Sequence, residues 1–276
     1  MSEQTSDDVV LQELDAHGVL LLTWNRPERN NGWSIQLEEA YFGALIDAAN
    51  DPRVKSIVVT GAGRTFCPGM DISTLERSAS GEKPTSLPRR WPMTTARLIP
   101  KPVIAAINGA CAGIGFIQAA CADIRFAARG ARFTTAFARR GLPAENALSW
   151  ILPRLIGQAN AVDLLLSARV IDADEARNLG FLNGVVEPDR LLPTALAYAR
   201  DLADNCSPNA MAMIKQQIGD DWNDDAESSR LKALVLMSEA GQHPDFAEGV
   251  KSFTEKRPPN FPGLAAQLKI SKSINR

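Results

Sequence analysis

Residues 101–117 read KPVIAAINGACAGIGFI, and this stretch decides the fold class. The run KPVIAAING is short, apolar and rich in β-branched residues, which predicts a buried strand. The following AGIGFIQAACA (112–122) predicts a buried helix, and DIRFAA (123–128) predicts the next strand. Strand, turn, helix and strand in this order indicate an α/β core.

The residues before this stretch follow a similar plan. VVLQEL and GVLLLTW flank DAHG and predict a hairpin. Ser34 is placed to cap a helix over the next sixteen residues, and DPRVKSIVVTG (51–61) returns to a strand. The polar stretch RSASGEKPTSLPRR (77–90) predicts a surface loop. From about Asp189 helical patterns replace strands, so we expect an α/β core over residues 1–200 and a helical C-terminal region over 201–276.

Composition excludes several classes of function. The 276 residues are 45% hydrophobic and carry 30 basic against 32 acidic side chains, a net charge of −2, with no block of like charge. We therefore expect no nucleic-acid and no membrane partner. The opening MSEQTSDDVV lacks the pattern of a secretory signal, and the longest apolar run is interrupted by Gln118, so we expect a cytoplasmic protein. The four cysteines form no C-x-x-C pair, and we expect neither a metal site nor a disulfide.

Two glycine-rich turns, TGAGRTFCPGMDI (60–72) and NGACAGIGFIQ (108–118), are candidates for binding. GAGRTF (61–66) partly mimics a dinucleotide fingerprint, but Phe66 occupies the third glycine position, which weakens that interpretation. In PGMD (68–71), Gly69 permits close backbone approach and Asp71 can cap the next helix, leaving the Met70 N–H free. In the second turn Gly113 and Gly115 bracket Ile114 where a helix begins. Two such donors would form an oxyanion hole if they converge, whereas tight turns that need glycine only for steric reasons explain the pattern equally well.

Several further stretches carry a family resemblance. FCPGMDI, KPVIAAINGACAGIG, CADIRFA, FARRGLPAENALSWILPRLIG and EGVKSFTEKRPPNFPG resemble the motifs of the crotonase, or enoyl-CoA hydratase/isomerase, superfamily, from about Val9 to Gly263. The resemblance implies a crotonase-type spiral of ββα units, a helical C-terminal trimerisation region and an acyl-CoA thioester as substrate. It also implies that the N–H groups of Met70 and Ile114 hold the thioester oxygen as it becomes an enolate.

The same resemblance implies further binding residues and partners. Pro68, Gly69 and Gly113 would contact the substrate, Arg64 would lie beside the CoA adenine, and Lys256 would reach CoA phosphates from a neighbouring subunit. Without the resemblance, Arg64 and Lys256 are ordinary solvated surface residues. The implied assembly is a homotrimer or a dimer of trimers, and no cofactor is needed because coenzyme A is part of the substrate.

One departure from the family pattern concerns the acid–base residues. A hydratase of this family uses two glutamates, and the corresponding positions are Ile117 and Phe137, which cannot polarise water. Glu145 instead completes FARRGLPAE, which resembles the single-glutamate pattern of the peroxisomal type of Δ3,Δ2-enoyl-CoA isomerase. Its apolar neighbours Leu142, Ala144, Ala147, Leu148 and Trp150 predict a poorly solvated carboxylate with a raised pKa.

Three functions remain open. We expect an enoyl-CoA isomerase that uses Glu145 as its proton shuttle. The first alternative is an enoyl-CoA hydratase with an atypical single carboxylate, and the second is a non-catalytic acyl-CoA binding protein. In the last case Glu145 would only be a glutamate at a helix start, which the helix dipole favours.

Overall fold

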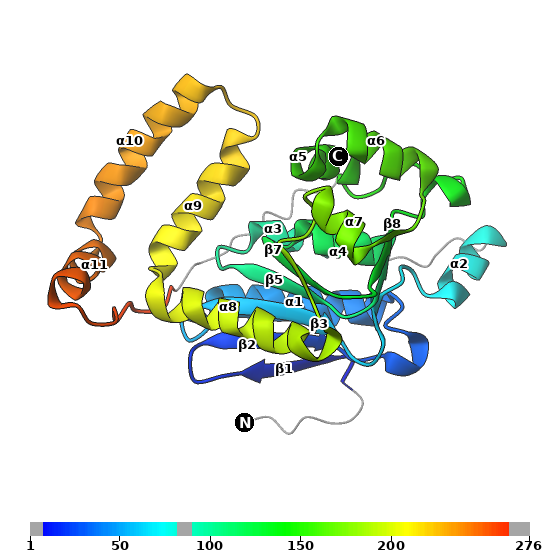
Figure 1. The fold of residues 1–276 in the computed structure, drawn as a ribbon, viewed down its shortest axis with the longest axis horizontal. Coiled ribbons are helices and arrows are strands. Elements are labelled where there is room, and N and C mark those ends of the chain that lie inside the picture. Colours follow the sequence, from blue (N-terminus) through cyan, green and yellow to red (C-terminus); the bar gives the residue numbers. More distant parts are fainter. Residues whose placement is uncertain (1–7, 82–89, 265–276) are drawn as a thin grey trace.

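The computed structural model describes residues 8–81 and 90–264 as an α/β fold with two sheets and helices at the C-terminal end (Figure 1). The large sheet has, in spatial order, β1 (Val10–Leu14), β2 (Val19–Trp24), β3 (Ser56–Gly61), β5 (Val103–Ile107), β7 (Ile124–Ala128) and β10 (Gly184–Val186). The small sheet has β4 (Thr65–Cys67), β6 (Ala110–Ala112), β8 (Arg132–Thr134) and β9 (Ile171–Asp172). Neighbouring strands run parallel except in the β1–β2 and β8–β9 pairs.

A repeated unit links the two sheets. Strands β3, β5 and β7 of the large sheet are followed along the chain by β4, β6 and β8 of the small sheet. A helix comes after each of the first two pairs, α2 (Ile72–Ala79) and α4 (Ile114–Cys121), and α5 (Leu148–Ile156) follows the third after a connecting segment. This is the ββα repeat that the family resemblance implies.

Helices cover both faces of the large sheet. On one face, small residues of α8 (Leu191–Asn205) pack against side chains such as Val58 and Ile104. On the other face lies the main core, to which α1 (Ile35–Asn50) contributes and whose largest members are aromatic. Because both faces of the sheet are covered, every residue of β3 and β5 is buried, and neither strand alternates between buried and exposed residues.

The remaining helices connect these units. They are η1 (Pro27–Arg29), α3 (Thr95–Leu98), η2 (Ala138–Arg140), α6 (Gln158–Ser167), α7 (Ala173–Asn178) and η3 (Pro188–Arg190). No helix in the described ranges is both long and apolar enough to cross a membrane.

The last three helices form an arm that stands away from the sheets (Figure 1): α9 (Pro208–Asp221), α10 (Ala226–Gln242) and α11 (Pro244–Glu255). Among these residues α9 buries Pro208 and α10 buries none. Of the region predicted to be helical, 201–276, the described residues form the end of α8 and then α9, α10 and α11 up to Glu255, whereas residues 256–264 are not helical. The predicted boundary at residue 200 falls inside α8, which packs on the sheet.

The local predictions are largely confirmed. The hairpin joins β1 and β2, and the Ser34 hydroxyl accepts a hydrogen bond from the Leu37 N–H at 3.2 Å, which caps α1. Of the predicted loop over 77–90, residues 77–79 continue α2, so the loop begins later than expected. Residues 82–89 lie outside the described part.

Candidate active site

The two glycine-rich turns lie against each other. Strands β4 and β6 pair in parallel, so the turns that follow them emerge side by side. Gly69 has φ +109° and Gly113 has φ +51°, both in the left-handed region that favours glycine. A Cβ added to Gly113 would lie 3.7 Å from the Gly69 Cα, and one on Gly115 would collide with the Cys67 carbonyl at 2.1 Å. Tertiary packing therefore brings together the turns that the sequence singled out.

The amides of Met70 and Ile114 lie at this junction without a hydrogen-bond acceptor among the described residues. The Trp33 N–H donates to the Gly69 carbonyl at 2.8 Å, and the Asp71 N–H donates to the Trp33 carbonyl at 3.0 Å, a pairing that leaves out the Met70 N–H. Ile114 is the first residue of α4, where N–H groups have no partner within the helix. Within the described ranges neither N–H donates a hydrogen bond. Two unpaired amides on adjoining turns are the components of an oxyanion hole.

Residues 26–33 brace the first turn, a role that sequence analysis missed. Arg26 forms an ion pair with Asp71 at 3.2 Å and a hydrogen bond to the Gly32 carbonyl. The buried Asn31 amide donates to the Thr65 carbonyl at 2.7 Å. The stretch NRPERNNG (25–32) is rich in turn-forming residues and does not by itself reveal this role, because Arg26 and Asn31 contact residues far along the chain.

Asp71 takes the capping role predicted for it. Its carboxylate accepts from the Ser73 N–H at 3.2 Å, in the first turn of α2. Burial by itself would raise the pKa of Asp71. The hydrogen bonds from Ser73 and the ion pair with Arg26 outweigh this effect, so the pKa of Asp71 is lowered. The carboxylate therefore stays charged and holds the start of α2 next to Met70.

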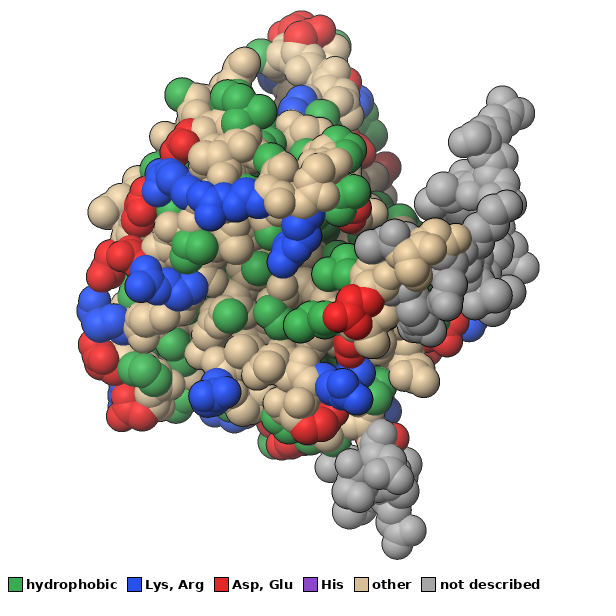
Figure 2. Space-filling model, turned by 90° about the vertical axis from the view of Figure 1, so that its right-hand side faces the viewer, with side chains coloured by type: hydrophobic (Ala, Val, Ile, Leu, Met, Phe, Trp, Pro, Cys, Tyr) green, Lys and Arg blue, Asp and Glu red, His purple; other side chains and the backbone are tan. Residues whose placement is uncertain are grey.

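A cavity of about 410 Å³ opens beside this turn. Pro68 and Met70 line it together with residues of the 28–32 segment and of α2. Gly113, Ile114 and Glu145 are not part of its wall, so it lies on the outer side of the Met70 turn. Figure 2 shows the face at the right of Figure 1, toward which α2 projects, with basic and acidic side chains interspersed among hydrophobic ones.

Glu145 lies in an irregular segment before α5. It is half-buried, and its carbonyl accepts from the Leu148 N–H at 2.9 Å. The next two residues, Asn146 (φ +50°) and Ala147 (φ +61°), are both left-handed, a conformation that costs a non-glycine residue roughly 1–2 kcal/mol. Since α5 begins at Leu148, Glu145 is not in the first helical turn, which argues against a helix-start role. Left-handed non-glycine residues concentrate at functional sites, where surrounding structure holds them.

The expected apolar enclosure of Glu145 is incomplete in the single chain. Leu148 is buried, but Leu142 is 41% exposed and Ala147 is exposed as well. The prediction of a poorly solvated carboxylate is therefore not supported by one chain alone.

The two hydratase positions are apolar and buried. Ile117 in α4 is 0% exposed and Phe137 is 6% exposed, and both belong to the main core. A thiol does not replace a carboxylate here: burial raises the pKa of the nearby Cys67 to about 12, so its thiol stays protonated. All four cysteines are free thiols in the structure.

The structure places the two predicted CoA contacts in different parts of the chain. Arg64 is exposed at the start of the β4 segment. Lys256 is exposed just past the end of α11, in the arm and on the opposite side of the molecule from α2 (Figure 1). A single chain therefore does not place Lys256 beside Met70.

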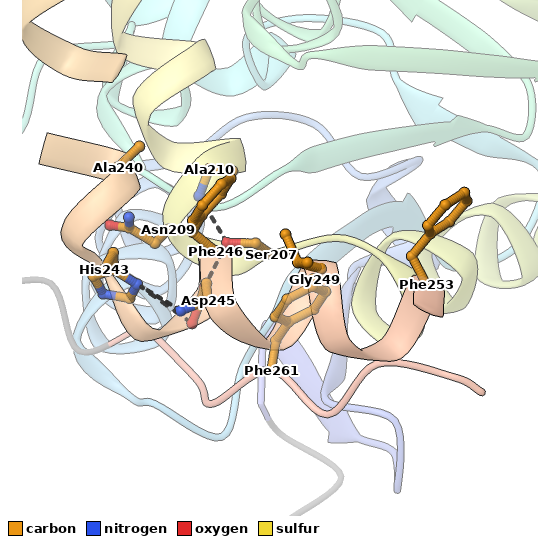
Figure 3. Close-up of a pocket in the computed structure, with 11 residues that line it drawn as sticks. Ser207, Asn209, Ala210, Ala240, His243, Asp245, Phe246, Gly249, Phe253 and Phe261 are labelled. Carbon is orange, nitrogen blue, oxygen red and sulfur yellow. Dashed lines mark hydrogen bonds and ion pairs between the residues drawn. The ribbon is translucent and has the colours of Figure 1, made fainter. Parts of the chain in front are cut away.

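A second cavity, with a volume of about 530 Å³, lies in the arm and is mostly apolar. A serine, a histidine and an aspartate are among the residues that line it (Figure 3). Ser207 donates directly to Asp245, and the Asp245 N–H donates to the His243 ring at 3.2 Å. Ser207 and His243 cap the starts of α9 and α11. The serine is bonded to the aspartate rather than to the histidine, so this is a capping cluster and not a hydrolytic triad.

Metal ligands do not cluster in the part of the chain that the structure covers. No group of three or more His, Cys, Asp or Glu side chains there is arranged to hold a metal ion.

Comparisons with known proteins agree with this geometry. Residues 15–264 match the family described as enoyl-CoA hydratase/isomerase. The chain is 35% identical to 1,2-epoxyphenylacetyl-CoA isomerase of Escherichia coli (strain K12), over 89% of this chain and 95% of that protein. It is also 35% identical to a probable enoyl-CoA hydratase of Rhodobacter capsulatus, over 90% and 96%.

A solved structure of a probable enoyl-CoA hydratase/isomerase from Mycobacterium abscessus superposes with a TM-score of 0.83 and 30% identity, covering 92% of this chain and 99% of that one. The fold, the adjoining glycine turns and these similarities lead to one conclusion: this chain belongs to the enoyl-CoA hydratase/isomerase family of the crotonase superfamily.

Proposed function

We propose that this protein is an enoyl-CoA isomerase that moves a carbon–carbon double bond in an acyl-CoA thioester, with Glu145 as its proton shuttle. One observation carries the proposal. Buried apolar side chains occupy both hydratase positions, while Glu145 is held after them by two left-handed residues. The name of the Escherichia coli relative, 1,2-epoxyphenylacetyl-CoA isomerase, favours isomerisation of a CoA thioester over addition of water.

The mechanism follows from one carboxylate and two amides. The N–H groups of Met70 and Ile114 hold the thioester oxygen and stabilise the negative charge that develops there. Glu145 takes a proton from C2 of a 3-enoyl thioester, and the electron pair delocalises through the enolate to C4. The same carboxyl group then returns the proton to C4, so the C3–C4 double bond becomes a C2–C3 double bond. No water is consumed, and the carboxylate is regenerated.

Hydration of a 2-enoyl-CoA is the second candidate. The name of the Rhodobacter relative favours it, and Glu145 would then have to activate water and protonate C2 without a second acid. A non-catalytic acyl-CoA binding protein is the third. It would keep both glycine turns while Glu145 pointed away from them.

Substitution of Glu145 by Gln tests the proposal. Gln keeps the shape and hydrogen bonding of the side chain but removes its basicity, so isomerisation should fall by about two to four orders of magnitude while acyl-CoA binding changes little. The assay should offer 2-enoyl, 3-enoyl and 1,2-epoxyphenylacetyl thioesters, which separates double-bond migration, water addition and epoxide isomerisation. Exchange of the α-proton with solvent deuterium that continues undiminished in Glu145→Gln would remove Glu145 from the mechanism.

We further propose that the protein assembles as a homotrimer or a dimer of trimers through its C-terminal arm. The arm exposes large apolar side chains that a stable soluble chain normally covers. They are Ile214, Ile218, Leu231, Leu234, Val235, Met237, Phe246, Val250 and Phe253. A neighbouring subunit would cover this surface and could bring its Lys256 toward the substrate site.

A further inference from the structure

A stack of two tryptophans and two arginines joins three helices that are distant in sequence. The ring of Trp150, in α5, lies 4.5 Å from the ring of Trp222, just past the end of α9. The guanidinium carbon of Arg97, in α3, lies 4.0 Å from the Trp222 ring centre, and that of Arg154 lies 4.3 Å from the Trp150 ring centre. Each arginine also lies within 6 Å of the other tryptophan. Such contacts stabilise most when the cation is partly desolvated. The Arg97 side chain is partly desolvated, and this burial lowers its pKa.

The stack is a point where the arm is attached to the body. Along α9, the Lys215 ammonium forms an ion pair with Asp123 at 2.6 Å and donates to the carbonyls of Ala96 and Lys101 at 3.2 Å. Trp222 provides the second attachment, and both tryptophans pack on the main core. Figure 1 shows the end of α9 directed toward the side of the body that carries α5.

Trp150 is connected through the backbone to Glu145. The Trp150 N–H donates to the Ala147 carbonyl at 3.0 Å, and the Leu148 N–H donates to the Glu145 carbonyl at 2.9 Å. Between these bonds lie the two left-handed residues Asn146 and Ala147. Such a conformation persists only where neighbouring structure imposes it, and the clamped Trp150 ring is one such constraint.

We propose that Trp222 is a positioning residue: through Trp150 it holds the segment that carries Glu145 in the geometry needed for proton transfer. This inference rests on the proposed function of Glu145. A displacement of about 1 Å at a reacting group can cost about a hundredfold in rate, so the loss of one ring in the stack is sufficient to affect catalysis. The C-terminal arm therefore contributes to the active site of its own chain.

A double-mutant cycle tests the coupling. Isomerisation is measured for Trp222→Ala and Trp222→Phe, each in the wild-type and in the Glu145→Gln background. Trp222→Ala should lower kcat roughly 10- to 100-fold with KM changed less than about twofold, and Trp222→Phe should recover most of the rate. In the Glu145→Gln background the same Trp222→Ala change should cost less than about twofold, because residues that act as a unit are not additive.

Tyr198→Ala is the matched control. Tyr198 is an aromatic residue of α8 that packs edge-on against Phe126 at 5.6 Å, on the face of the large sheet away from Glu145. The Tyr198→Ala substitution should leave kcat unchanged. If Trp222→Ala does not fold, Arg97→Met, which removes one cation and keeps its stem, replaces it in the same cycle.

The outcomes separate the two proposals. An equal loss of kcat in both backgrounds, or no loss in the wild-type background, would overturn the positioning role while leaving Glu145 as the base. A Glu145→Gln protein that keeps full activity would overturn the proposed function and this inference with it.

Discussion

At the scale of single residues, the backbone conformation of Gly113 determines which amino acids this position tolerates. Its φ of +51° and ψ of −116° form a combination that side-chain-bearing residues rarely adopt. Space is not the limit, because an added Cβ would be in ordinary contact with Gly69 at 3.7 Å. Glycine is therefore needed for the conformation that leaves the Ile114 amide free.

We predict that Gly113→Ala impairs catalysis beyond its effect on folding. Strain should lower the free energy of unfolding by about 1–3 kcal/mol, and displacement of the Ile114 amide should lower kcat about a hundredfold or more. Gly130 is the control: it also has positive φ, +93°, but an added Cβ there would meet open space. Gly130→Ala should lose stability by a similar mechanism and keep full activity. Equal activities of the two variants in thioester turnover would contradict the role of the Gly113 turn.

At the scale of elements, the segment after α11 is held by one carboxylate. Glu248 accepts from Arg257 at 2.7 and 3.0 Å and from the Asn260 N–H at 2.7 Å. The Arg257 guanidinium, followed by the Asn260 N–H, lowers the pKa of Glu248 from 4.5 to about 2. Lys251 adds to this effect, and Glu255 shares the Arg257 partner.

This pKa predicts a loss of stability in acid. A carboxyl group whose pKa is lower in the folded than in the unfolded state stabilises the fold above its unfolded pKa, and its contribution disappears as the pH falls through the folded value. The stability difference between wild type and Glu248→Gln should therefore be largest above pH 4.5 and shrink as the pH falls toward 2. Thermal unfolding between pH 7 and 3 measures it, with Glu239→Gln on α10 as an exposed control. A difference that stays constant with pH would refute the linkage.

At the scale of the whole molecule, the arm carries the exposed apolar surface through which we propose that the chain assembles. Leu234 in α10 is 58% exposed in the single chain, and Phe253 in α11 is 85% exposed. Burying such side chains between subunits stabilises an oligomer by roughly 25 cal/mol per Å² of apolar surface. The proposed trimer supplies that burial.

Leu234→Glu should therefore dissociate the oligomer without unfolding the chain. The new charge would be buried at a subunit interface in the assembly, which is unfavourable, but solvated in the monomer. Light scattering should report the mass of one chain, about 30 kDa, with an unchanged circular dichroism spectrum. Gln242→Glu, which adds the same charge at a polar exposed position of the same helix, should leave the mass of the oligomer unchanged. A monomeric wild-type protein would contradict the proposed assembly.

Local patterns in the sequence were sufficient for much of the fold. Residues 101–117 predicted β5 and α4, Ser34 predicted the start of α1, and the glycines expected to permit tight turns, Gly69 and Gly113, have positive φ. Each of these depends on interactions between residues close in the chain, such as helical periodicity, capping and positive φ at glycine. The role of Glu145 stays a prediction.

Only the tertiary structure showed what depends on distant residues. The brace formed by residues 26–33, the contact between the two turns, and the Trp150–Trp222 stack join segments from different parts of the chain. The incomplete enclosure of Glu145 has the same origin, since apolar neighbours in sequence bury a carboxylate only if the chain folds them over it. Sequence by itself determined which elements form and which turns need glycine, because these follow from short-range sterics and hydrogen bonding. Packing between distant elements decided which of those groups meet, because that depends on how strands pair and helices cover them.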